Sequence, residues 1–179
     1  MQFLLKVSRW IDALSEAIGW LTFGLTLVMV VVGGYNAITR YLGQFIGVNL
    51  SSNIYIEIQW YLFSLVFLLG ACYVLKLGGH VRVDIFYSQL SVRGRAWIDL
   101  LGGFLLLLPM CGVIFFYSFP TVVNSWRILE MSSDASGLPR YPLKTMILVA
   151  FALLALQGVS EIIKQLAILT GHHQVEEAR

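Results

Sequence analysis

Four long apolar segments dominate the chain, and the charged residues gather in the connections between them. Residues 17–39 hold 23 consecutive positions without a charged side chain, which exceeds the roughly 20 residues that cross a hydrocarbon core. The other three segments have similar lengths. The pattern predicts an all-α integral membrane protein with a single domain, 1–179. Its four transmembrane spans are expected at about 17–39, 55–76, 96–119 and 142–164, and a polar tail at 170–179.

The segment before the first span has a different pattern. Residues 3–16 alternate apolar and charged side chains at helical spacing, which predicts an amphipathic helix lying in the membrane interface. A cleavable signal peptide fits less well, because Asp12 and Glu16 interrupt its basic start. The apolar run that follows also exceeds the usual 7–15 residues or so.

Small residues recur along one face of the first span, and such faces let helices approach closely in lipid. An alternative is that glycine and threonine are simply common in spans. We favour a packing seam made by Gly19, Thr22, Thr26, Gly33 and Ala37. In the third span, Pro109 predicts a bend. Near the end of the fourth span, polar residues recur on one helix face at Gln157, Glu161 and Lys164.

Composition supports lipid as the main solvent. Charged residues make up 12% of the chain, about half the share of a soluble domain, and 58% of the residues are hydrophobic. The net charge of +2 is not gathered on a basic face, so no nucleic-acid partner is expected. Eight of the twelve Lys and Arg residues fall on the side of both termini and of the connection after the second span, which predicts that this side is cytoplasmic.

The candidate chemistry is sparse. His80, His172 and His173 all lie outside the spans, so they cannot ligate a haem within the membrane. The usual motifs of metalloproteases, P-loops and serine hydrolases are absent from the sequence. We expect no catalytic residue, no metal, no cofactor and no substrate-binding residue. Glu57, in the first turns of the second span, is either a buried functional group or a solvated acid at a helix start; the helix dipole favours the second interpretation.

Several segments together resemble a known family: residues 57–63 (Glu-Ile-Gln-Trp-Tyr-Leu-Phe), 67–71 (Phe-Leu-Leu-Gly-Ala), 79–84 (Gly-His-Val-Arg-Val-Asp), 124–127 (Asn-Ser-Trp-Arg) and 137–144 (Gly-Leu-Pro-Arg-Tyr-Pro-Leu-Lys). They are similar to the small, DctQ-like membrane subunit of tripartite ATP-independent periplasmic (TRAP) transporters, in the mannitol/chloroaromatic or 2-oxo acid branch. The resemblance covers nearly the whole chain.

This resemblance implies a bacterial or archaeal cytoplasmic membrane and two protein partners. One is a large membrane subunit of about twelve spans, which moves substrate by an elevator-type mechanism driven by a sodium or sometimes a proton gradient. The other is a periplasmic binding protein that delivers an organic acid. The small subunit would serve as a scaffold. An independent small transporter and a structural subunit of an unrelated complex are the alternatives.

The resemblance also suggests contact residues. A docking loop for the binding protein would include Trp126, Arg127 and Arg140. The polar residues of 80–84 alternate with apolar ones, which fits either a short amphipathic segment at the cytoplasmic interface or a hydrogen-bonded clasp. The candidate family-motif or subunit-contact residues are Glu57, Trp60, His80, Arg82 and Asp84.

Overall fold

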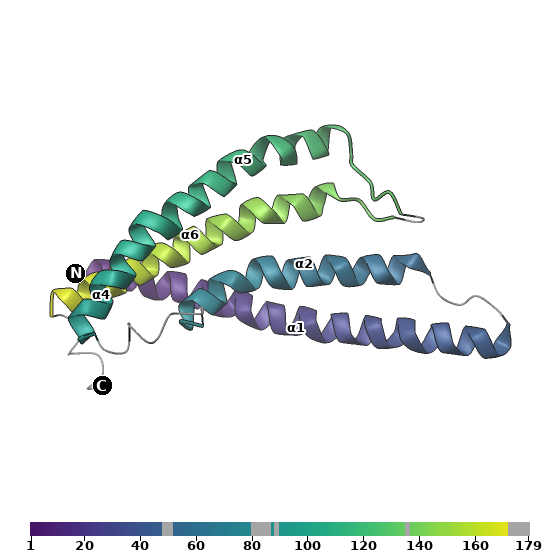
Figure 1. Ribbon diagram of the computed structural model, residues 1–179, viewed down its shortest axis with the longest axis horizontal. Helices are drawn as coiled ribbons and strands as arrows, with labels where there is room; N and C mark the ends of the chain where they lie inside the picture. The colour runs from purple at the N-terminus through teal and green to yellow at the C-terminus, as the bar shows by residue number, and fades with distance from the viewer. Residues whose placement is uncertain (48–51, 80–86, 88–89, 135–136, 172–179) are drawn as a thin grey trace.

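The computed structural model describes residues 1–47, 52–79, 87, 90–134 and 137–171 (Figure 1). Among these residues, four helical stretches are long and apolar enough to cross a membrane, which confirms the predicted all-α fold with four membrane-spanning helices. The elements in chain order are α1 (Gln2–Ile46), α2 (Asn53–Lys76), α4 (Val92–Gly102), the π-helical turn η1 (Gly103–Leu107), α5 (Leu108–Arg127) and α6 (Tyr141–Leu169).

The helices form two antiparallel pairs, α1 with α2 and α5 with α6 (Figure 1). The N-terminus, α4 and the end of α6 lie together at what we call the terminal end. The end of α1, the start of α2 and the loop between α5 and α6 lie at the opposite end, which we call the hairpin end. Helix α6 is central, because it packs against α1, α2, α4 and α5.

Helix α1 differs from the expected arrangement. Residues 3–16 do not form a separate interfacial helix but are the first turns of one 45-residue helix. The change from an amphipathic to an apolar pattern at residue 17 does not interrupt the backbone, since no proline or capping turn stands there. At 1.5 Å per residue the helix is about 68 Å long, roughly twice the thickness of a hydrocarbon core.

The predicted seam of small residues is confirmed in part. Gly19 and Thr22 are buried, and a Cβ at Gly19 would lie 2.5 Å from the ring of Tyr73 in α2. Ala37, in contrast, is exposed and lies off the seam. All the buried positions of α1 carry glycine or a small hydroxyl side chain, so its backbone can approach its neighbours closely: Ser8, Ser15, Gly19, Thr22, Thr39 and Gly43.

The third membrane-spanning stretch contains two prolines. Pro109 has no N–H to donate to the carbonyl of Leu105, and the widened turn η1 lies just there. Pro120 lies inside α5, which continues to Arg127 instead of ending near residue 119. Packing outweighs the lost hydrogen bond, because Val122 and Ser125 are buried after the proline. The connection between α5 and α6 therefore shortens to residues 128–140, the connecting loop, of which 135–136 are not described.

Candidate functional site

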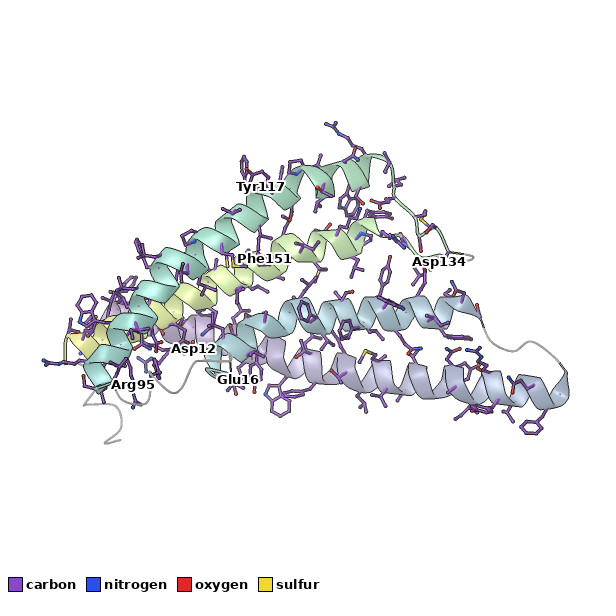
Figure 2. The ribbon with its side chains drawn as sticks, in the orientation of Figure 1. Asp12, Glu16, Arg95, Tyr117, Asp134 and Phe151 are labelled. Atoms are coloured by element: carbon purple, nitrogen blue, oxygen red, sulfur yellow. The ribbon has the colours of Figure 1, made fainter. Side chains whose placement is uncertain are left out.

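Polar side chains concentrate at the two ends of the bundle (Figure 2). Asp12, Glu16 and Arg95 lie at the terminal end, and Asp134 lies at the hairpin end. Within the described ranges, no three His, Cys, Asp or Glu side chains come together as a metal site would require. The polar groups at the two ends are the candidate contact sites.

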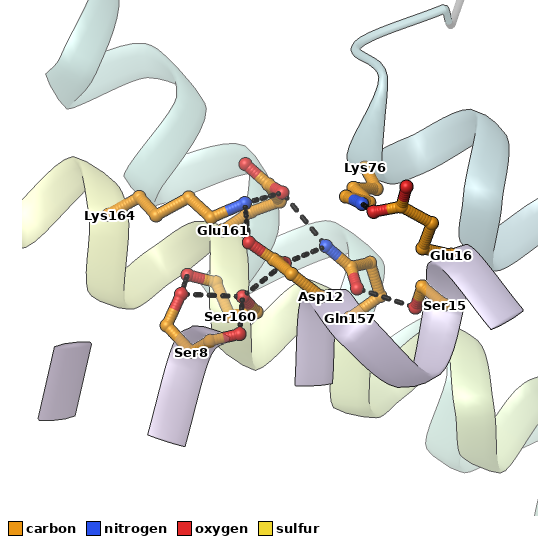
Figure 3. A network of polar contacts seen from close by, with 9 residues as sticks. All are labelled: Ser8, Asp12, Ser15, Glu16, Lys76, Gln157, Ser160, Glu161 and Lys164. Carbon is orange, nitrogen blue, oxygen red and sulfur yellow. Dashed lines mark hydrogen bonds and ion pairs between the residues drawn. The ribbon is translucent and has the colours of Figure 1, made fainter. Parts of the chain in front are cut away.

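The terminal end holds a hydrogen-bonded network between α1 and α6 (Figure 3). We call it the terminal-end network; its members are Ser8, Asp12 and Ser15 of α1 and Gln157, Ser160, Glu161 and Lys164 of α6. Ser8 Oγ and Ser160 Oγ are 2.7 Å apart. Asp12 Oδ1 accepts hydrogen bonds of 2.9 Å from Ser160 Oγ and from Gln157 Nε2.

Gln157 is the centre of this network and is completely buried. Its Oε1 accepts a 2.7 Å hydrogen bond from Ser15 Oγ, while its Nε2 donates to Asp12 and, at 2.9 Å, to Glu161 Oε1. Three side chains on two helices thus depend on one amide group. Burying an amide among apolar groups costs free energy unless its donors and its acceptor are hydrogen-bonded. The Gln157 amide has a partner for its oxygen and two for its nitrogen.

Lys164 is the one cation of the network and pairs with both of its carboxylates. Its Nζ lies 2.8 Å from Asp12 Oδ2 and 2.8 Å from Glu161 Oε1. A further ion pair, 2.6 Å between Lys76 Nζ and Glu16 Oε2, links α1 to α2 beside it (Figure 3). Throughout the described part of the chain, every buried side-chain nitrogen and oxygen has a hydrogen-bond partner. The terminal-end network therefore joins α1 to α6, and the neighbouring ion pair adds a contact between α1 and α2.

At the hairpin end, Glu57 connects α2 to the connecting loop. Its side chain is buried, and its Oε2 accepts a hydrogen bond from the backbone N–H of Leu138. One turn further along α2, the Tyr61 hydroxyl donates to the carbonyl of Pro139. The expectation of a solvated acid at Glu57 is therefore wrong: the loop folds over the first turns of α2 and covers the carboxylate.

Glu130 organises the loop itself. Its carboxylate lies 2.5 Å from Lys144 Nζ and accepts a 2.7 Å hydrogen bond from Ser125 Oγ, while its carbonyl accepts from the N–H of Arg140 at 2.8 Å. The hydrogen bond from Lys144 and then that from Ser125 lower the pKa of Glu130 below its ordinary value. The Glu130–Lys144 ion pair therefore stabilises the loop at every pH above the ordinary pKa of a glutamate. This stabilisation is lost only as the pH falls through the lowered pKa of Glu130.

The structure brings the three predicted docking residues to one region. Trp126 and Arg127 lie in the last turn of α5 rather than in the loop, and Arg140 directly precedes the first residue of α6. The Trp126 ring lies 4.5 Å from that of Tyr141, and its Nε1 donates a 2.8 Å hydrogen bond to Thr145 Oγ1.

The remaining candidates divide between exposed and undescribed positions. Arg127 and Arg140 are exposed, and Arg140 Nη2 donates a 3.2 Å hydrogen bond to Ser132 Oγ. Trp60 is 69% exposed on α2. His80, Arg82 and Asp84 lie outside the described residues.

Sequence reasoning missed four of the seven members of the terminal-end network: Ser8, Asp12, Ser15 and Ser160. The helical spacing of Gln157, Glu161 and Lys164 indicated a polar face on α6, which the structure confirms. Asp12 was assigned to the polar face of an interfacial helix, and neither Ser8 nor Ser15 was identified as a contact. The position of Ser8 and Ser15 on the same face as Gly19, at spacings of seven and four, is the signal that could have identified them.

A family model for the DctQ component of tripartite ATP-independent periplasmic transporters matches residues 29–168. The chain belongs to the DctQ family. No curated protein and no solved structure matches it. As a DctQ-family chain it is a multi-pass membrane protein and the small subunit of a TRAP transporter, a component of a transporter rather than a member of an enzyme family. The family works with a large membrane subunit and a periplasmic binding protein.

Proposed function

We propose that this DctQ-family chain is a static scaffold for a large elevator-type subunit in the cation-gradient-driven uptake of an organic acid. The observation that carries the proposal is the placement of charge. The charged side chains that the structure describes lie toward the two ends of the bundle, and the four apolar stretches between them carry none near their centres. A chain that moved an ion or an acid by itself would need such groups near the bilayer centre.

The network of contacts within the chain also supports a scaffold role. The terminal-end network joins α1 to α6, and Glu57 and Tyr61 join α2 to the connecting loop at the other end. Both ends of the two helix pairs are therefore tied by specific hydrogen bonds. A subunit held in this way provides a rigid surface against which a moving partner can slide.

The hairpin end is the proposed periplasmic face. The excess of Lys and Arg on the other side of the membrane favours termini in the cytoplasm of an inner-membrane protein. The region around Trp126, Arg127 and Arg140 then faces the periplasm, where the binding protein delivers substrate. Glu57, Tyr61 and Glu130 position this region for docking through their contacts with the connecting loop.

The first test is the identity of the partner. Affinity purification of the tagged chain from its native membrane in mild detergent is expected to recover a large, many-span permease in equal amount, as mass spectrometry would show. Recovery of an unrelated complex would contradict the scaffold role. Elution of a folded chain alone would also contradict it and would require flux assays on the isolated protein.

The second test concerns docking. Charge reversal at both arginines (Arg127→Glu with Arg140→Glu) is expected to raise the binding-protein concentration for half-maximal uptake about tenfold, because exposed interface charges steer association. Uptake by the reconstituted complex measures this. Arg40→Glu, an exposed arginine on α1 toward the same end, is the control and should change little. An unaltered dependence on the binding protein in the double variant would count against this docking region.

A further inference from the structure

A groove of about 460 Å³ lies between α2 and the start of α6, at the hairpin end. Its apolar lining comes from Ile56, Trp60 and Leu143, and its polar lining from Glu57, Arg140 and Lys144. Asp134 and Ser64 also line it. The groove therefore has charged groups from α2, α6 and the connecting loop beside apolar walls, as a site for an amphiphilic molecule requires.

The groove extends toward the middle of the bundle. From Ile56 to Ser64 it follows α2 for eight residues, about 12 Å at 1.5 Å per residue. Trp60 stands along this path and is 69% exposed, so the groove opens sideways onto the surroundings of α2. In a membrane-spanning helix those surroundings are lipid, and tryptophan and tyrosine near a helix start mark the headgroup level. The apolar part therefore lies at the depth where an acyl chain begins.

The polar part carries both signs of charge. Arg140 gives one of its five N–H donors to Ser132, and Lys144 gives one of its three to Glu130, so each keeps donors for a phosphate. Two carboxylates, of Glu57 and Asp134, line the same groove. Glu57 is held by the N–H of Leu138, whereas Asp134 is exposed. An ammonium group next to a phosphate would complement Asp134, whereas a purely anionic headgroup would place a further negative charge beside it.

We propose that this groove binds one glycerophospholipid with a zwitterionic, amine-bearing headgroup. The phosphate lies against Arg140 and Lys144, the ammonium against the exposed carboxylate of Asp134, and the first part of one acyl chain follows Trp60 to Ser64. The lipid fills the space between α2 and α6 beneath the connecting loop. This inference depends on the membrane location of the chain and not on the scaffold or docking proposals.

Photolabelling of the complex of this chain with its large subunit tests the proposal. The complex is reconstituted in vesicles containing phosphatidylethanolamine with a photoreactive group in the acyl chain, and labelled peptides are quantified by mass spectrometry. The α2 peptide carrying residues 56–64 is expected to take up about fivefold more label than the exposed apolar stretch 20–31 of α1, a preference of roughly 1 kcal/mol. Phosphatidylglycerol with the same acyl chain should label α2 less.

Two variants separate the parts of the site. Ser64→Phe fills the acyl portion without changing the charged groups and should remove most of the excess label. Gly112→Phe, on α5 where an added Cβ meets nothing within 4 Å, is the matched control and should leave it unchanged. Asp134→Asn, on the exposed loop, should abolish the preference for phosphatidylethanolamine over phosphatidylglycerol and does not depend on tolerance of a bulky residue in α2.

Several results would overturn the proposal. Uniform labelling of all exposed helices would mean ordinary annular lipid. Equal labelling of wild type and of an assembled Ser64→Phe complex would place the lipid elsewhere. Labelling of α2 in the isolated chain but not in the complex would mean that the large subunit fills the groove. Equal labelling of the wild type by phosphatidylethanolamine and phosphatidylglycerol would contradict the proposed charge complementarity.

Recovery of the partner is measured without labelling, so the scaffold proposal and the lipid proposal fail separately. Arg140 belongs both to the groove and to the docking region. Asp134→Asn leaves both docking arginines in place and therefore tests the lipid without changing them.

Discussion

Replacing Gln157 with leucine is expected to be among the most destabilising single substitutions in the chain. The change keeps the side-chain volume but removes the amide that Ser15, Asp12 and Glu161 share. Hydrogen bonds across membrane helices contribute about 0.6 kcal/mol each on average, and a buried group left unpaired costs about 1–3 kcal/mol. We therefore expect the free energy of unfolding to fall by about 2 kcal/mol.

The two cysteines provide a measurement of this effect. Cys72 and Cys111 are free and only 1% and 2% exposed, so a thiol-reactive dye labels them when the bundle opens. In mild detergent, the temperature of half-maximal labelling should fall by about 4–8 °C for a loss of 2 kcal/mol in a chain of this size.

Gln59→Leu is the matched control for this substitution. The Gln59 amide bonds to the carbonyl of Tyr55 within its own helix, so its loss should shift the labelling temperature little. Equal shifts for the two variants would show that the terminal-end network does not hold α1 against α6.

The second large effect is expected at Gly19. A side chain there would meet three ring atoms of Tyr73 at 2.5–2.8 Å, and the ring cannot move freely because it also packs edge-on against Phe23, 6.0 Å away. Gly19→Val is expected to push α1 and α2 apart and to lower the free energy of unfolding by about 2 kcal/mol, as overpacking does elsewhere. The same cysteine-labelling assay measures it.

Gly24→Val is the control for this second effect. Gly24 lies on the same helix, but an added Cβ meets nothing within 4 Å there. Because valine forms helix slightly better than glycine, the control should leave stability unchanged or raise it a little. If Gly24→Val lowered the labelling temperature as much as Gly19→Val, the cause would be the helix itself and not the contact with Tyr73.

Glu57 shows the limit of local reasoning at the candidate site. From its neighbours in sequence it is an acid in the first turns of a helix, where the dipole and water both favour an exposed carboxylate. Its burial depends on Leu138, 81 residues away, whose N–H it accepts. The connecting loop has no apolar or charge pattern that points to α2. Only the packing of α6 beside α2 brings the loop over that carboxylate.

Helix α1 shows a different limit. Its polar pattern before residue 17 is compatible with a helix on the membrane surface or with one continuous helix, since both present the same faces. Asp12 and Ser8 decide between the two structures only through their partners on α6, about 150 residues later in the chain.

The sequence by itself determined the class of the protein, the number of spans and the small-residue face of α1 around Gly19. These follow from apolar content, from run length and from helical spacing, all of which are local properties acting against a solvent of known thickness. The tertiary structure alone decided the continuity of α1, the extension of α5 beyond Pro120, the partners of Asp12 and Gln157, and the groove along α2. Each of these depends on which helix faces lie together, and a polar or small side chain does not specify its partner until distant segments have packed.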